Sequence, residues 1–283
     1  MSPAGLLAVS CKGCGGAVAM PAGAPHPRCL FCGSEAVVAE RAREDIEIPG
    51  TFLPFEVDEA KVREAFRAKA RASIWYPGDL RDATLEFKPL LLPAWTWSGE
   101  VETHWAALIP AATSSGKRPV TGADTYRVLG VLVPSSSALT RAELNAIVPY
   151  SGEHAFQFRA EEATAPFEIG RLTRSAACDA ARAALAESHV ARLQAERRAS
   201  VLRGSHLFRD LAGLPVLLPV YIGAYRRRGR LFRVVFNGQT GKVTGEFPIS
   251  WLRVGCAVLG GLLLLAGLLL FFGLLFGLLA AYG

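Results

Sequence analysis

The last 30 residues constrain this chain more than any other segment. Residues 254–283 contain no charged side chain and consist almost wholly of Leu, Gly, Ala, Phe and Val. A helix crosses the hydrocarbon core of a bilayer with about 20 apolar residues, so this segment is long enough to span it with some tilt. A buried core helix is the alternative, but such a helix rarely runs this far without a polar face. Trp251 and Tyr282 flank the segment like interfacial aromatic residues, and we predict a transmembrane helix over residues 251–283.

Basic residues near this segment favour one orientation in the membrane. Lys and Arg are enriched on the cytoplasmic flanks of membrane spans. The N-terminus has neither a basic region nor a long apolar run, so we expect no secretory signal peptide. We therefore predict a tail-anchored, single-pass protein of the cell inner membrane with its N-terminal domain in the cytoplasm. The basic residues are Arg253 beside the span and Arg226, Arg227, Arg228 and Arg230 about 20 residues before it.

Those arginines have two interpretations. They could contact acidic lipid headgroups, or they could form the solvated tip of a β-hairpin. The net charge of +6 and the isoelectric point of about 9.1 suit anionic lipid and nucleic acid equally well, so they do not choose between these partners.

Four of the six cysteines form two close pairs, which is typical of metal ligation in a reducing compartment rather than of disulfides. Cys11-Lys-Gly-Cys14-Gly and Cys29-Leu-Phe-Cys32-Gly are two C-x-x-C-G knuckles, with 14 residues between Cys14 and Cys29. Each knuckle can present two thiolates to a tetrahedral zinc ion. Four thiolates leave no open coordination position, so we predict one structural Zn²⁺ held by Cys11, Cys14, Cys29 and Cys32. His26 is an alternative ligand, but the cysteines already complete the shell.

The pattern between these two ends predicts an α+β fold. We expect a small zinc ribbon over residues 1–38, a linker over 39–50, and a mainly β cytoplasmic domain with a few helices over 51–250. The last domain is either single or divided in two, with residues 205–250 as a β-hairpin module.

Three helices are expected in the cytoplasmic domain. Asp58 is a good N-cap for a helix that ends near Ser73, and its basic residues, such as Arg67, form either a solvated face or a binding groove. Thr140 and Glu143 have the spacing of a capping box, which predicts a short helix before Pro149. The longest helix is expected over residues 173–203, with His189 on its surface. The apolar face of the first helix would carry Val62, Phe66 and Ala70.

Alternation of bulky and small residues predicts strands elsewhere. Trp95, Trp97 and Trp105 could stack on bases, but the bulky face of a sheet is the commoner role for such a pattern. Asn237-Gly238 between two apolar runs is a strong hairpin signal. The remaining strands are expected at Tyr126–Val133, Ala155–Phe158, Val216–Tyr225, Leu231–Phe236 and Lys242–Phe247.

Several motifs occur together in a recognisable order: the cysteine knuckles, Leu53-Pro-Phe55, Leu92-Pro-Ala-Trp95, the segment from Asn237 to Gly245, and the apolar tail. In this combination the chain resembles the bacterial membrane-anchored zinc-ribbon proteins, with a ribbon of the transcription-factor-IIB type, which are often labelled primosomal helicase-like. Some of these proteins are linked to phage-shock protein A and flotillin-like (SPFH) scaffolds. The resemblance implies a membrane adaptor with a role in envelope stress or membrane organisation.

The residues exclude a helicase and offer no enzyme motif. A Walker loop needs Gly-Lys followed by Ser or Thr, whereas Arg118 follows Gly116-Lys117 and Val243 follows Gly241-Lys242. The sequence contains neither H-E-x-x-H nor G-x-S-x-G. We therefore predict a protein without enzymatic activity.

Two functions follow from these observations: an adaptor that docks cytoplasmic or membrane proteins, and a membrane-held nucleic-acid-binding ribbon. Nucleic-acid binding needs several cations against phosphate, and residues 1–34 offer only Lys12 and Arg28. The adaptor is therefore favoured. Gly273-x-x-x-Gly277 would also allow two spans to pack closely as a homo-oligomer.

Overall fold

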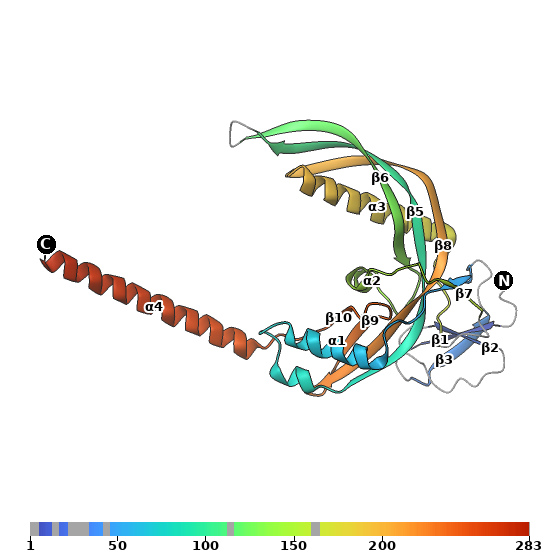
Figure 1. Cartoon of the computed structure of the whole chain (residues 1–283), viewed down its shortest axis with the longest axis horizontal. Helices are drawn as coiled ribbons and strands as arrows, with labels where there is room; N and C mark the ends of the chain where they lie inside the picture. The colour runs from blue at the N-terminus through green and yellow to red at the C-terminus, as the bar shows by residue number, and fades with distance from the viewer. Residues whose placement is uncertain are drawn as a thin grey trace.

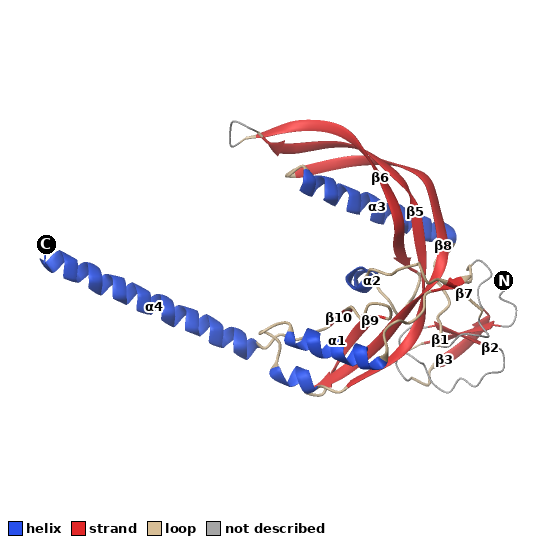
Figure 2. Ribbon diagram, viewed as in Figure 1, coloured by secondary structure: helices blue, strands red, loops and turns tan. Residues whose placement is uncertain are grey.

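The computed structural model describes residues 6–12, 17–21, 34–41, 46–111, 116–159 and 165–282. Within these residues the chain has an α+β fold, which confirms the predicted class (Figures 1 and 2). A mixed seven-stranded sheet forms its centre, and a smaller antiparallel sheet near the N-terminus has the strand order β2-β1-β3.

The elements follow one another in this order: β1 Leu6–Cys11, β2 Ala17–Pro21, β3 Val37–Arg41, β4 Thr51–Phe52, α1 Glu59–Arg71, the 3-10 helix η1 Gly78–Asp82, β5 Leu85–Pro110, β6 Lys117–Pro134, α2 Arg141–Ile147, β7 Phe156–Gln157, α3 Arg174–Glu196, β8 Val201–Arg227, β9 Arg230–Asn237, β10 Val243–Gly245 and α4 Trp251–Tyr282.

Two very long strands organise the large sheet. β5 and β8 have 26 and 27 residues and pair antiparallel from Leu85 and Tyr225 to Leu108 and Val201. Figure 1 shows these strands and β6 curving into an arch, with α3 along its inner side. β6 pairs with the other edge of β5, while β9 and β10 extend the sheet beyond the C-terminal half of β8.

The two faces of β5 are covered by different elements, because successive side chains of a strand point to opposite sides. Leu90, Leu92 and Ala94 lie in a cluster with α2. Trp95 and Trp97 point to the other face and pack against Ala177 and Ala181 of α3. The tryptophans are therefore buried in the sheet, as predicted, and the Trp95 and Trp97 rings stack 5.8 Å apart.

The first two predicted helices are confirmed together with their caps. The Asp58 carboxylate accepts a hydrogen bond from the backbone N–H of Lys61 at 2.8 Å, at the start of α1. The capping box of Thr140 and Glu143 is present at the start of α2. The apolar face of α1 is buried as expected through Val62, Phe66 and Ala70.

The third helix and its histidine need correction. α3 ends at Glu196, not at Arg203, because Arg198 adopts a positive φ of 49° and β8 begins at Val201. His189 is 1% exposed, not on the surface. The small Ala177 and Ala181 side chains allow α3 to lie close to the sheet, so His189 reaches Thr103, with Nδ1 2.8 Å from Oγ1.

The hairpin before α4 is confirmed, but its asparagine has a further role. β9 and β10 pair antiparallel, and Gly241 takes the positive φ of 72° that the turn requires. The buried Asn237 amide donates to the carbonyl oxygens of Ile147 at 2.9 Å and Pro149 at 2.8 Å. Its side-chain oxygen accepts from the backbone N–H groups of Gln239 and Thr240. The turn is therefore fastened to the end of α2.

Replacing Asn237 by Leu is expected to destabilise the α+β domain by about 3–5 kcal/mol. The change leaves several buried backbone groups without a partner, and each such group costs about 1–3 kcal/mol. Denaturant unfolding of the full chain in mild detergent, followed by tryptophan fluorescence, measures the effect. Asn145→Leu on the exposed surface of α2 is the matched control and should change stability by about 0.5 kcal/mol or less. Equal destabilisation by both variants would contradict the role given to Asn237.

Candidate membrane-proximal site

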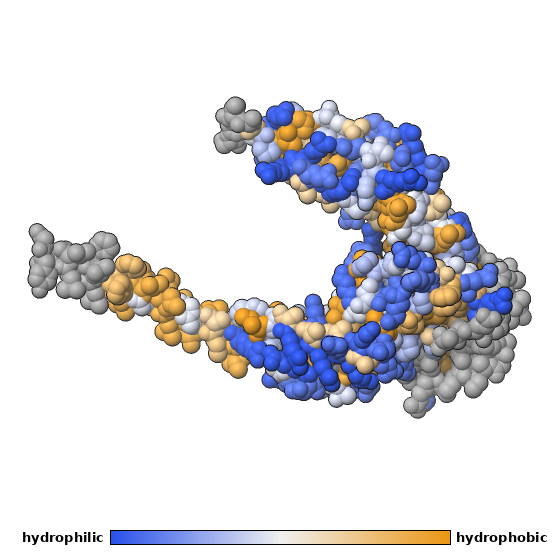
Figure 3. Space-filling model, in the orientation of Figure 1, coloured by the Kyte–Doolittle hydropathy of each residue, from blue (hydrophilic) through white to orange (hydrophobic). Residues whose placement is uncertain are grey.

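The described residues contain one helix that is long and apolar enough to cross a membrane. The qualifying part of α4 runs over Trp251–Gly273, and none of it is buried against the rest of the chain. Figure 3 shows this helix as a hydrophobic rod that projects away from a mainly polar body. The predicted C-terminal apolar helix is therefore present. On α4, Gly273 faces open space, and Gly277 follows one turn later.

The start of α4 is fastened to the corner between α1 and η1. The backbone N–H of Ser250 donates to the carbonyl oxygen of Trp75 at 2.8 Å. The Arg253 guanidinium donates to the carbonyl oxygens of Ile74 at 2.8 Å and Tyr76 at 2.7 Å. Lipid contact by Arg253 stays a prediction, and in the structure this residue joins the apolar helix to the α+β domain.

The other predicted arginines lie at the tip of the β8–β9 hairpin. Arg228 and Gly229 have positive φ values of 48° and 79°, as the twist of a two-residue hairpin turn requires. Arg227 Nε lies 3.1 Å from both carboxylate oxygens of Asp79 in η1, and this hydrogen bond lowers the pKa of Asp79. Arg253 is hydrogen-bonded to the residues just before η1, and Arg227 is hydrogen-bonded to η1 itself. The hairpin tip and the start of α4 therefore lie at the same end of the sheet. Arg226, Arg228 and Arg230 are exposed there.

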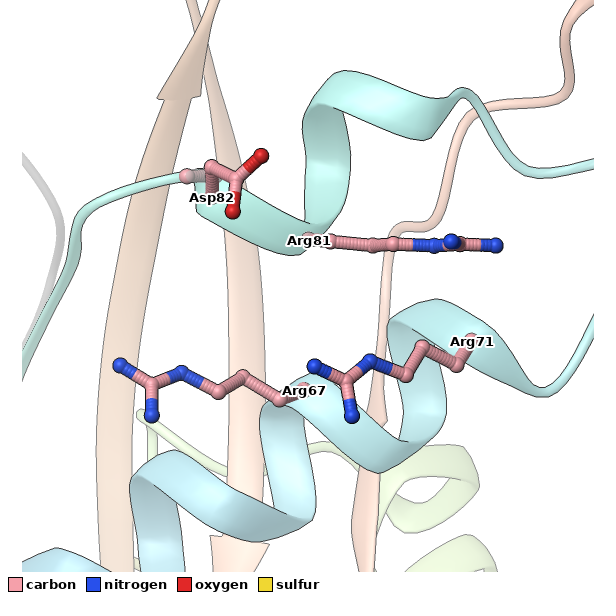
Figure 4. A pocket seen from close by; sticks show the side chains of 5 residues that line it. Arg67, Arg71, Arg81 and Asp82 are labelled. Atoms are coloured by element: carbon pink, nitrogen blue, oxygen red, sulfur yellow. The ribbon is translucent and has the colours of Figure 1, made fainter.

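Two surface depressions lie at this end of the sheet. The larger, of about 1020 Å³, is lined by apolar residues of β5, β8 and β9 and by the polar and charged residues Thr84, Glu86, Lys88, Arg226, Arg228 and Arg233. The smaller, of about 320 Å³, lies between α1 and η1 (Figure 4). We call the smaller one the arginine cleft; its lining residues are Arg67, Arg71, Arg81, Asp82 and Ala83.

The sequence did not assign the arginine cleft to a site. The basic residues of α1 are compatible with either a solvated face or a binding groove, and Arg81 lies ten residues further along the chain than Arg71. Only the fold of η1 back over α1 brings Arg81 beside the other two. The only sign of the cleft in the sequence is that Arg67 and Arg71 are four residues apart, which places both on one face of the helix.

The predicted zinc ligands are only partly covered by the described residues. Cys11 ends β1, is 2% exposed, and lies opposite Val37 of β3. Cys14, Cys29 and Cys32 lie outside the described residues, as does His26. In the part of the chain that the structure describes, no group of three or more His, Cys, Asp or Glu side chains could hold a metal. The zinc site therefore stays a prediction.

One buried polar cluster joins α3 to the sheet. Thr103 Oγ1 lies 2.8 Å from His189 Nδ1 and 2.9 Å from His206 Nδ1, and burial lowers the pKa of both histidines. This cluster lines neither of the two depressions. It connects β5, β8 and α3, which is a role in packing.

A second buried cluster surrounds Glu168. Its carboxylate accepts hydrogen bonds from the hydroxyls of Ser136 and Ser137 and from the backbone N–H of Ser137 at 2.8 Å. Burial raises the pKa of Glu168, against the lowering effect of these hydrogen bonds. The cluster fastens the segment after β6 to the segment before α3.

Fold and site together define a chain in which an exposed apolar helix is joined to an arched α+β domain. Comparison with protein-family models, with curated proteins and with solved structures finds no match to this chain. The resemblance to membrane-anchored zinc-ribbon proteins therefore stays a prediction.

Proposed function

We propose that the protein is a membrane-tethered, non-enzymatic zinc-ribbon adaptor that docks partner proteins at the cytoplasmic face of the bacterial inner membrane. The observation that carries this proposal is α4. Its first turn is hydrogen-bonded to the α+β domain, while its apolar side chains as far as Gly273 are not covered by any other part of the chain that the structure describes. A bilayer covers such a helix without leaving backbone groups unpaired, because a helix satisfies them internally.

The arch offers a surface for a partner. Among the described residues, β6 pairs with β5 alone, so its other edge is open over Lys117–Pro134. An open strand edge is a template for pairing with an extended segment of another protein. This favours protein docking, and the resemblance suggests phage-shock or flotillin-like scaffolds as the partners.

The ribbon is proposed to be a structural zinc module. Cys11 is buried at the end of β1, as a thiolate in a closed zinc site would be. The other three cysteines of the motif would complete a site without an open position, so the metal would supply folding free energy and no reaction.

A pull-down from native membranes tests the adaptor against the nucleic-acid alternative. The tagged full chain is captured in mild detergent, with and without nuclease, and its partners are identified by mass spectrometry. We expect the same membrane or stress proteins in both samples. Recovery of nucleic acid, with loss of the accompanying proteins after nuclease treatment, would overturn the adaptor in favour of a nucleic-acid-binding ribbon.

A further inference from the structure

The corner that holds α4 is itself apolar. Ile74 and Trp75, between α1 and η1, are 73% and 38% exposed. They carry the backbone carbonyls to which Arg253 and Ser250 are hydrogen-bonded, so they lie beside the first turn of α4. Exposed apolar patches of this kind mark interaction or membrane surfaces. We call it the apolar corner; its residues are Ile74, Trp75, Ile249, Trp251 and Leu252, the last three being 52%, 81% and 78% exposed.

The arginine cleft adjoins this corner. Arg71 ends α1 only three residues before Ile74, and Figure 4 shows Arg67 and Arg71 projecting in the same direction from successive turns, opposite η1. Three arginines and one aspartate line the cleft, and Figure 4 shows the Arg81 side chain projecting the opposite way from those of Arg67 and Arg71. In the described part of the chain, no ion pair or hydrogen bond is formed by the guanidinium groups of Arg67, Arg71 and Arg81. Like charges four residues apart on a helix repel each other, and a bound anion would relieve this repulsion.

We propose that the apolar corner lies in the bilayer interface and that the arginine cleft binds the phosphates of anionic phospholipid headgroups. This inference rests on the proposed membrane span. Trp is enriched at the boundary between headgroups and acyl chains, and guanidinium groups match phosphate oxygens in a bidentate arrangement. The apolar corner lies next to α4 and the arginine cleft follows it, in the same order as the acyl chains and the headgroup phosphates of a lipid leaflet. A site for free phosphate would not require this order.

Lipid-dependent quenching of Trp75 tests the proposal in the full chain. In a Trp251→Phe background, the remaining tryptophans besides Trp75 are Trp95, Trp97 and Trp105, which are buried in the sheet. The protein is reconstituted into vesicles of phosphatidylcholine with brominated acyl chains, with or without phosphatidylglycerol. We expect quenching that increases with phosphatidylglycerol, that is lost when Trp75→Phe is added, and that inorganic phosphate does not reverse.

Arginine variants then test the cleft. Arg67→Gln/Arg71→Gln/Arg81→Gln should lose the increase caused by phosphatidylglycerol. The matched control changes Arg118, Arg127 and Arg203 to Gln, three exposed arginines on the distal half of the sheet, and should retain it. Unchanged emission from the buried tryptophans shows that the variants fold.

The outcomes separate this inference from the proposed function. Alkaline carbonate extraction of the same vesicles reports the span. If the protein remains in the pellet but Trp75 is not quenched, the interfacial corner is overturned while the span stands. The headgroup site is overturned if the quenching of Trp75 does not depend on phosphatidylglycerol. It is also overturned if inorganic phosphate abolishes the quenching. Release of the protein by carbonate would overturn the membrane span and, with it, this inference.

Discussion

Changing Leu262, Leu265 and Leu269 to arginine is expected to release the protein from membranes. The three side chains are 59%, 54% and 66% exposed and lie in the middle of the apolar helix α4. An arginine at the centre of a span costs about 2.5–3.5 kcal/mol on the insertion scale, so three cost about 8–10 kcal/mol. The nine leucines, three phenylalanines and two valines that remain in residues 254–283 contribute about 4–8 kcal/mol together, which does not fully compensate. Carbonate extraction of native membranes should move the variant from pellet to supernatant.

The matched control places three arginines on the sheet instead. Leu129, Leu207 and Leu214 are 77%, 51% and 65% exposed in β6 and β8. Their replacement adds the same charge and should leave the protein in the pellet. If the α4 variant also stays in the pellet, α4 is not the anchor, and the proposed tether is wrong.

Removing zinc is expected to unfold the N-terminal module. We expect one zinc per chain by elemental analysis, and its loss in Cys14→Ser/Cys29→Ser or after treatment with a strong chelator. Structural zinc contributes on the order of 10–16 kcal/mol to the folding of small ribbons. The pairing of β1 with β2 and β3 should then be lost, which hydrogen exchange of the Leu6–Cys11 amides would detect.

Two other cysteines supply the control for the metal. Cys178 in α3 and Cys256 in α4 lie outside the predicted knuckles. Cys178→Ser/Cys256→Ser should therefore keep the full zinc content. Slow exchange of the β1 amides in a metal-free protein would show that the module folds without zinc and would remove the basis for a ribbon.

Local chemistry explains which elements the sequence could predict. α1 and α2 were found because Asp58, Thr140 and Glu143 act on backbone groups within the same turn. The tryptophans of β5 were assigned to a sheet face because alternation is a property of neighbouring residues. α4 was evident from composition alone.

The remaining features depend on contacts between distant segments. The predicted strand at Val216–Tyr225 is part of a much longer β8, because β5 pairs with polar residues such as Arg203 and Arg209 that give no apolar signal. His189 is buried because α3 packs against the sheet, where its side chain is hydrogen-bonded to Thr103, 86 positions away in the sequence. The arginine cleft likewise exists only because η1 returns over α1.

The uninterrupted course of β5 and β8 has a mechanical consequence. Both strands run from the end that carries α4 to the far end of the arch, and they are hydrogen-bonded to each other along nearly their whole length. A partner pulling on the far end against the membrane would load these bonds in shear. Many bonds then share the force, whereas peeling would break them one at a time. If α4 is the anchor and a partner docks at the far end, the arch would transmit tension between them along these paired strands.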